Sequence, residues 1–158
     1  WGVDELRLPD APPPGAVAQA LNLLKALGAL DDDDRITAHG KALLALGVHP
    51  RLANAMLRAP TALRGLACDL AALLDSRDPL RGPAARDDDL RPRLAALASW
   101  RTARGITDGV DRSALASIDQ LASQWRRRLG AEPRGNAPGS HDVGDLLALA
   151  YPDRIARR

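Results

Sequence analysis

The sequence predicts a mainly α-helical fold with one small β-hairpin near its N-terminus. Alanine and leucine supply most of the hydrophobic residues, which make up 46% of the 158-residue chain, whereas Phe is absent and Tyr occurs once. Val, Ile and Thr are scattered, so no run of them is typical of a buried strand. Because alanine and leucine are strong helix formers and the chain is long enough to bury a sizeable core, we expect a packed helical protein.

The first third of the chain predicts a helical unit with a two-stranded wing. The three prolines at residues 12–14 predict the start of a helix. Its apolar spacing continues to Gly28, where the helix is expected to end. Four adjacent aspartates, Asp31–Asp34, lie between short apolar pieces and are expected at the solvated tip of the hairpin. Thr37 is a good N-cap for a helix over about 38–46, and Pro50 opens another helix. Residues 1–60 are therefore predicted to form a winged-helix-like domain.

The remaining residues, 61–158, predict a helical bundle. Leu63 to Leu74 form the clearest amphipathic helix, and a loop rich in Pro, Gly and charge follows. Leucines from Leu90 onward continue in helical register. A longer helix is predicted to begin near Asp111 or Ser113 and to end near Leu129. A last helix is expected from Asp142 to about Tyr151, after a flexible loop, and Pro152 starts one more turn.

Several kinds of chemistry are excluded by spacing. Gly40-Lys41 lacks the glycine five residues earlier and the following hydroxyl that a phosphate-binding loop needs. His39 and His49 lie on different predicted elements with no further ligand for zinc, so we expect neither to bind metal. Cys68, the only cysteine, lies in an apolar helical stretch and is interpreted as a buried small hydrophobe. We therefore predict no catalytic residue, metal site or cofactor in this chain.

Arginine is the distinctive residue of the second half. Only two of the 22 basic residues are lysine, and residues 90–158 hold twelve arginines against seven acidic residues. Arginine suits phosphate geometry, and Trp100 and Trp125 adjoin arginines in a manner typical of single-strand binding. The spacing of Trp125, however, favours the core. The predicted nucleic-acid-binding residues are Arg101, Arg104, Arg126, Arg127 and Arg128. Three arginines at a helix end also fit a purely structural role.

A long stretch of the chain resembles the helicase-associated region of DEAH/RHA-type helicases. Within residues 8–59 the shared pattern is Pro-Pro, Leu-x-x-Leu-Gly-Ala-Leu-Asp, Ile-Thr-x-x-Gly and Pro-Arg-Leu. Residues 66–82 and 142–158 are similar to the bacterial HrpB-type helicases in particular. The resemblance implies a winged helix followed by a ratchet-like bundle, placed after two RecA-like domains and before an oligonucleotide-binding-like domain. On this basis residues 35–52 are scaffold in which Thr37 caps a helix and Gly40 permits close packing.

The resemblance also implies a function. The chain would be an accessory part of a cytoplasmic ATP-dependent RNA helicase, lining the nucleic-acid channel and coupling strand passage to the motor. ATP and Mg²⁺ would be bound by the parent protein, and single-stranded RNA would be the partner. No apolar run is long enough to span a membrane, and the start at Trp1 suggests a piece of a longer protein. Two alternatives stay open: a winged-helix regulator, which the acidic wing tip disfavours, and a pure protein-interaction scaffold.

Overall fold

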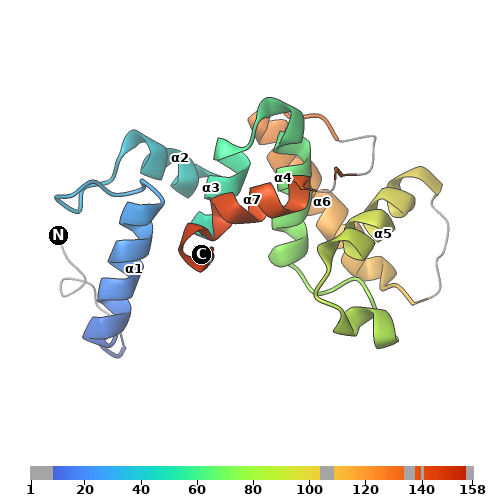
Figure 1. The fold of residues 1–158 in the computed structure, drawn as a ribbon, viewed down its shortest axis with the longest axis horizontal. Coiled ribbons are helices and arrows are strands. Elements are labelled where there is room, and N and C mark those ends of the chain that lie inside the picture. The colour runs from blue at the N-terminus through green and yellow to red at the C-terminus, as the bar shows by residue number, and fades with distance from the viewer. Residues whose placement is uncertain (1–8, 104–108, 134–137, 140, 156–158) are drawn as a thin grey trace. The chain divides into compact units, whose positions relative to one another are not determined.

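A computed structural model of the chain describes residues 9–103, 109–133, 138–139 and 141–155. These residues are mainly helical, as predicted, and divide into two compact units, residues 1–42 and residues 43–158 (Figure 1). Short 3-10 turns η2 (Thr61–Leu63), η3 (Gly82–Arg86) and η4 (Pro152–Arg154) accompany the helices. The α-helices are α1 (Pro14–Ala26), α2 (Ala38–Leu46), α3 (Pro50–Arg58), α4 (Arg64–Leu74), α5 (Leu90–Ala103), α6 (Arg112–Leu129) and α7 (Asp142–Ala150).

In the first unit, the turn between α1 and α2 is held by Thr37 and Gly40, as the sequence predicts. The Thr37 hydroxyl donates to the Gly28 carbonyl at 2.7 Å and accepts from the Gly40 amide at 2.9 Å. A Cβ atom at Gly40 would overlap the carbonyl oxygen of Ala29. Only glycine therefore allows α2 to begin this close to the end of α1. Thr37 and Gly40 therefore have structural roles in this turn.

The predicted β-hairpin is not confirmed, because the described residues contain no strand. One isolated antiparallel bridge joins Leu30 to Ile36. The aspartates between them form a local turn in which the Asp31 carboxylate accepts from the amides of Asp33 and Arg35, at 3.0 and 2.8 Å. With only one residue pair on each side, the ladder is too short to count as two strands. The winged-helix assignment of residues 1–60 accordingly stays a prediction.

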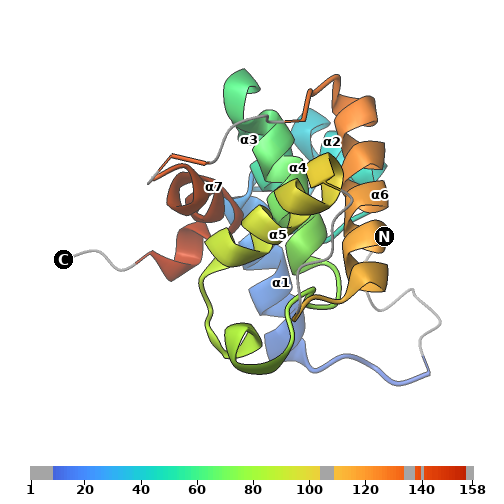
Figure 2. The ribbon, with the colours of Figure 1, turned by 90° about the vertical axis from the view of Figure 1, so that its right-hand side faces the viewer.

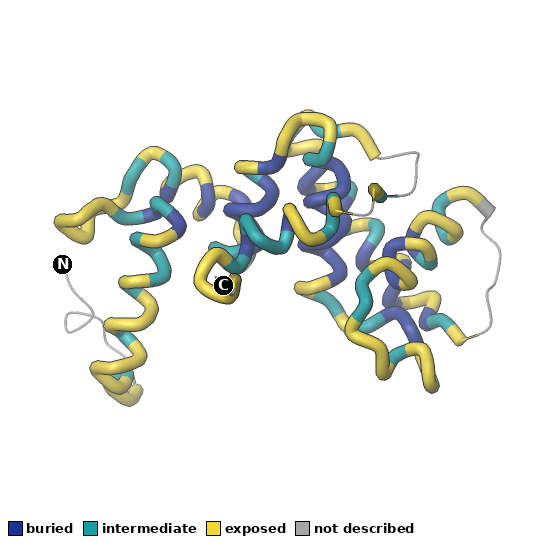
Figure 3. The backbone as a smooth tube through the Cα atoms, viewed as in Figure 1, coloured by how far each residue is buried: buried dark blue, intermediate teal, exposed yellow. Residues whose placement is uncertain are grey.

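The second unit is built around α4. Every residue from Gly65 to Leu73 is buried, so this helix is dark blue over most of its length in Figure 3. It packs against α6, α3 and α5, and it lies between α6 and α7 in Figure 2. A helix that is apolar on nearly all sides is expected at the centre of such a bundle. Cys68 is fully buried here, as predicted, and burial raises the pKa of its thiol to about 12.

α3 belongs by packing to this second unit, since it contacts α4 and α7. It begins at Pro50, and the His49 ring nitrogen Nδ1 accepts from the Arg51 amide at 3.3 Å. His49 thus serves as an N-cap, in line with the scaffold interpretation. The predicted division into two domains, residues 1–60 and 61–158, stays a prediction.

The loop between α4 and α5 is fixed by an arginine and an aspartate. Arg93 is buried and donates to the Asp78 carboxylate and to the carbonyls of Asp87 and Asp89. Asp111, the N-cap of α6, accepts from the amides of Ser113 and Ala114. Its carboxylate also accepts from the Ser113 hydroxyl and from Arg81, and these contacts hold its pKa well below the ordinary value.

The described residues contain neither a candidate membrane span nor a candidate metal site. No helix among them is long and apolar enough to cross a membrane. No group of three or more His, Cys, Asp or Glu side chains is arranged to hold a metal ion in that part of the chain.

Candidate nucleic-acid interface

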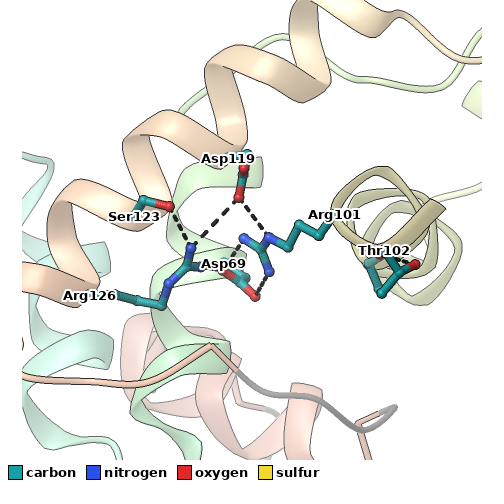
Figure 4. A network of polar contacts seen from close by, with 7 residues as sticks. Asp69, Arg101, Thr102, Asp119, Ser123 and Arg126 are labelled. Carbon is teal, nitrogen blue, oxygen red and sulfur yellow. Dashed lines mark hydrogen bonds and ion pairs between the residues drawn. The ribbon is translucent and has the colours of Figure 1, made fainter. Parts of the chain in front are cut away.

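Two of the five predicted RNA-binding arginines, Arg101 and Arg126, converge on one buried carboxylate (Figure 4). Arg101 of α5 donates to both oxygens of Asp69, on α4, at 2.8 Å each. Arg126 of α6 donates to one of the same oxygens through Nη1. A bidentate guanidinium–carboxylate pair is among the strongest hydrogen-bonded contacts in proteins. The contacts therefore join α4, α5 and α6 at one point.

A second carboxylate completes this cluster. Asp119 of α6 accepts from the Arg101 Nε at 2.6 Å and lies 3.7 Å from Arg126 Nη2, which also bonds the Ser123 hydroxyl. We call Asp69, Arg101, Asp119 and Arg126 the four-charge cluster. Two positive and two negative groups make it formally neutral, which buried charges require to avoid a large desolvation cost.

The guanidinium groups of this cluster are committed to partners inside the bundle. Asp69 is 5% exposed and Arg126 is 6% exposed. Burial alone would lower the pKa of Arg101, but its hydrogen bonds to Asp69 and Asp119 outweigh that effect and raise it. A phosphate could recruit either arginine only by taking it from Asp69, a buried carboxylate that would then keep one of its two guanidinium partners.

Trp125 and Arg128 of α6 contact the C-terminal end of α2. The Trp125 indole nitrogen donates to the Leu46 carbonyl at 3.3 Å, and Arg128 Nη1 reaches the carbonyls of Ala45 and Leu46. These side chains satisfy carbonyls that a helix end leaves without internal partners. Trp125 is 3% exposed, so its predicted place in the core is confirmed. Arg128 remains exposed despite these contacts, with further guanidinium donors.

Arg127 lies on the exposed face of α6, and no ion pair or hydrogen bond with another described residue engages its guanidinium. The exposed residues of α6 recur at helical spacing and form an outer face, and none of them is acidic; the single acidic residue of α6, Asp119, is 32% exposed and is paired within the four-charge cluster. Every residue of this face is uncharged or basic, whereas the chain as a whole has nearly equal numbers of basic and acidic residues, 22 and 20. The exposed residues of this face are Arg112, Ser113, Ala116, Ser117, Gln120, Gln124, Arg127 and Arg128.

The remaining predicted residue, Arg104, lies outside the described residues. Sequence reasoning missed Asp69 and Asp119, the carboxylates that hold Arg101 and Arg126. Asp69 stands out in the sequence only as the one acidic residue within an otherwise apolar helix. Such a residue signals a buried ionic partner without indicating which arginine supplies it.

Comparison with known proteins shows that the chain is similar to one region of a larger protein. No protein-family model matches the chain. The ATP-dependent RNA helicase HrpB of Escherichia coli (strain K12) is 32% identical over 154 residues, which are 94% of this chain and 16% of that protein. The chain is related to one region of HrpB. The predicted resemblance to a DEAH/RHA helicase is thereby confirmed.

Solved structures of HrpB give the same result. The crystal structure of the Escherichia coli DEAH/RHA helicase HrpB superimposes with a TM-score of 0.66 at 31% identity, covering 94% of this chain and 16% of the HrpB chain. A second structure, described as the Escherichia coli DExH-box NTPase HrpB, has a TM-score of 0.62 at 28% identity, with 99% and 16% coverage. The chain thus spans about one sixth of the length of the relative it matches.

Proposed function

We propose that this chain is an accessory region of an ATP-dependent RNA helicase and that it contacts the backbone of single-stranded RNA. The relation to one region of HrpB supports the helicase assignment. Motor activity would reside in RecA-like domains of the same polypeptide, where ATP and Mg²⁺ would bind, with an oligonucleotide-binding-like domain beside them. This region would line the nucleic-acid channel and couple strand passage to the motor.

The observation that carries the RNA proposal is the carboxylate-free outer face of α6. Binding to nucleic acid is dominated by release of counterions from phosphates, so an acidic residue on the contact surface would oppose it. Gln120 and Gln124, between the arginines, can donate hydrogen bonds to phosphate oxygens without reading sequence, whereas the hydroxyls of Ser113 and Ser117 already donate to the Asp111 carboxylate and the Ser113 carbonyl. From Arg112 to Arg127 the face extends about 22 Å, at the helical rise of about 1.5 Å per residue.

Within this proposal the five predicted arginines have two different roles. Arg127 and Arg128, on the outer face, would contact phosphate, and Arg112 at the other end of α6 joins them. Arg101 and Arg126 would act indirectly, by holding α6 in place through Asp69. Arg104 keeps its predicted role in binding, since it lies outside the described residues.

The test is a salt titration of binding to a labelled oligouridine, followed by fluorescence anisotropy. Two to four phosphate contacts predict that log K falls with log salt at a slope of about −1.4 to −2.8, since each contact on single strands contributes about −0.7. Affinity should be about micromolar and independent of base sequence. Absence of saturable binding at low salt, or a slope near zero, would refute the RNA proposal and favour the protein-interaction scaffold.

A further inference from the structure

The C-terminal segment Asp142–Arg154, made of α7 and η4 and here called the strap, is hydrogen-bonded to α3 near its C-terminal end. Asn54 of α3 donates to the Leu149 carbonyl at 2.8 Å, and Arg51 of the same helix donates to the Ala150 carbonyl at 3.2 Å. Arg51 also pairs with Asp153 at 2.9 Å. These contacts all meet the last turn of α7 or the turn that follows it.

Arg51 makes most of these contacts and is itself well enclosed. Its guanidinium carbon lies 5.1 Å from the centre of the Tyr151 ring, in addition to its contacts with Ala150 and Asp153. The side chain is 12% exposed, so water screens its charge less than at an open surface. One side chain of α3 thus engages three successive parts of the strap.

α7 packs mainly on α3, and two of its residues, Leu146 and Ala150, are buried. A small apolar hollow lies beneath the helix and is lined among others by Leu52, Leu70 and Leu147. A nine-residue helix is too short to be stable in water without tertiary contacts. The helicity of α7 therefore depends on its attachment to α3.

Gly144 lowers the stability of α7 further, although the packing around it does not require a glycine. A Cβ atom added there would have no heavy atom within 4 Å, so the site has room for alanine. Glycine within a helix is unfavourable relative to alanine because it loses more backbone entropy. The 18-residue α6, in contrast, is joined to α4 and α5 by the four-charge cluster.

We infer that the strap detaches from α3 as one unit while α4, α5 and α6 stay folded, and that Arg51 is the latch that sets how often it opens. Detachment uncovers the apolar faces of Leu52, Ala55 and Leu70, which line the hollow under α7. Segments with few buried contacts open locally at lower free energy than the core, and such openings proceed as cooperative units. This inference is independent of the RNA proposal.

Native-state hydrogen exchange of the 158-residue chain tests it. After correction for intrinsic rates, the amides of Leu146–Ala150 should share one opening equilibrium and exchange at least about tenfold faster than the slowest amides of α4 and α6. Arg51→Gln should speed exchange in the strap about tenfold or more, the effect of losing charge-assisted hydrogen bonds, and leave α4 and α6 unchanged. Arg154→Gln is the matched control, because Arg154 is 77% exposed and lies 3.6 Å from Asp153.

Gly144→Ala tests the same inference in the stabilising direction and does not depend on a damaged fold. Exchange in the strap should slow about fivefold, which corresponds to the roughly 1 kcal/mol advantage of alanine in a helix. If α7 instead exchanges together with α4 and α6 by global unfolding, or if Arg51→Gln speeds all three helices equally, the strap is part of the core and the inference is wrong.

Discussion

The inner side and the outer face of α6 use the same residue type for different purposes. Arg126 and Arg127 are neighbours in the sequence, yet one is 6% exposed and bound to Asp69 while the other is exposed on a carboxylate-free surface. Successive residues on an α-helix are rotated by about 100°, so adjacent arginines necessarily point in different directions. Clusters of arginine in a sequence therefore do not define a binding surface until their carboxylate partners are known.

Breaking the inner side should have the largest effect on stability. Asp69→Asn removes the charge that Arg101 and Arg126 share, which leaves the buried guanidinium of Arg126 and the half-buried one of Arg101 with Asp119 as their remaining carboxylate. We expect the free energy of unfolding to fall by about 3–5 kcal/mol, as for other buried ion pairs that lose one partner. Urea unfolding followed by tryptophan fluorescence measures this, with Asp75→Asn at the exposed end of α4 as the control. A loss below about 1 kcal/mol would contradict the role of the cluster.

Removing one arginine from the cluster should cost less, because Asp69 keeps its bidentate pair with Arg101. Arg126→Gln is expected to lower the free energy of unfolding by about 1.5–3 kcal/mol, the range for a hydrogen bond to a charged group. Arg127→Gln, the matched change on the outer face, should stay within about 0.5 kcal/mol of the parent. Equal losses in the two variants would show that the outer face is also structural.

An ion pair nearer the surface sharpens the comparison through its pH dependence. The hydrogen bond from Arg51 lowers the pKa of Asp153 from 3.8 to about 2, with Arg154 as a further nearby charge. A carboxylate whose pKa is lower in the folded chain stabilises it above the unfolded pKa and loses that effect as pH falls through the folded pKa.

Asp153→Asn should therefore lower the melting temperature at pH 6 by less than either change in the four-charge cluster. The difference between parent and variant should shrink as the pH falls from about 4 to about 2. Thermal melts at a series of pH values measure it, with the exposed Asp88→Asn as control. A difference that is constant from pH 6 to pH 2 would mean that the Arg51–Asp153 pair contributes nothing through its charge.

Local signals in the sequence predicted most of the helices. α2 occupies the predicted residues 38–46, α3 begins at Pro50, and α6 begins at Arg112, between the two predicted starting points Asp111 and Ser113. Caps, proline positions and apolar spacing act over a few residues, so a single sequence contains them. The predicted β-hairpin is not confirmed, because the sequence pattern indicates a turn but does not reveal how many residues pair on either side of it.

Contacts distant in the sequence could not be predicted in the same way. Arg101 meets Asp69 across 32 residues and Arg126 meets it across 57, on three different helices. Helix periodicity identifies which residues share a face but not which helix that face meets. For Trp125 the apolar stripe was sufficient, since burial requires only the side of its own helix. For Arg126 the partner decides the role, and the partner lies on another helix.

The central claim is that RNA contacts the outer face of α6 and not the four-charge cluster. The most direct measurement compares the salt dependence of oligouridine binding by Arg127→Gln and Arg126→Gln, each shown to be folded. We predict that Arg127→Gln makes the slope of log K against log salt less negative by about 0.7 and weakens binding about fivefold at 0.1 M salt. Arg126→Gln should leave both unchanged for the folded fraction. The opposite pattern, or a parent slope retained in both variants, would contradict the claim.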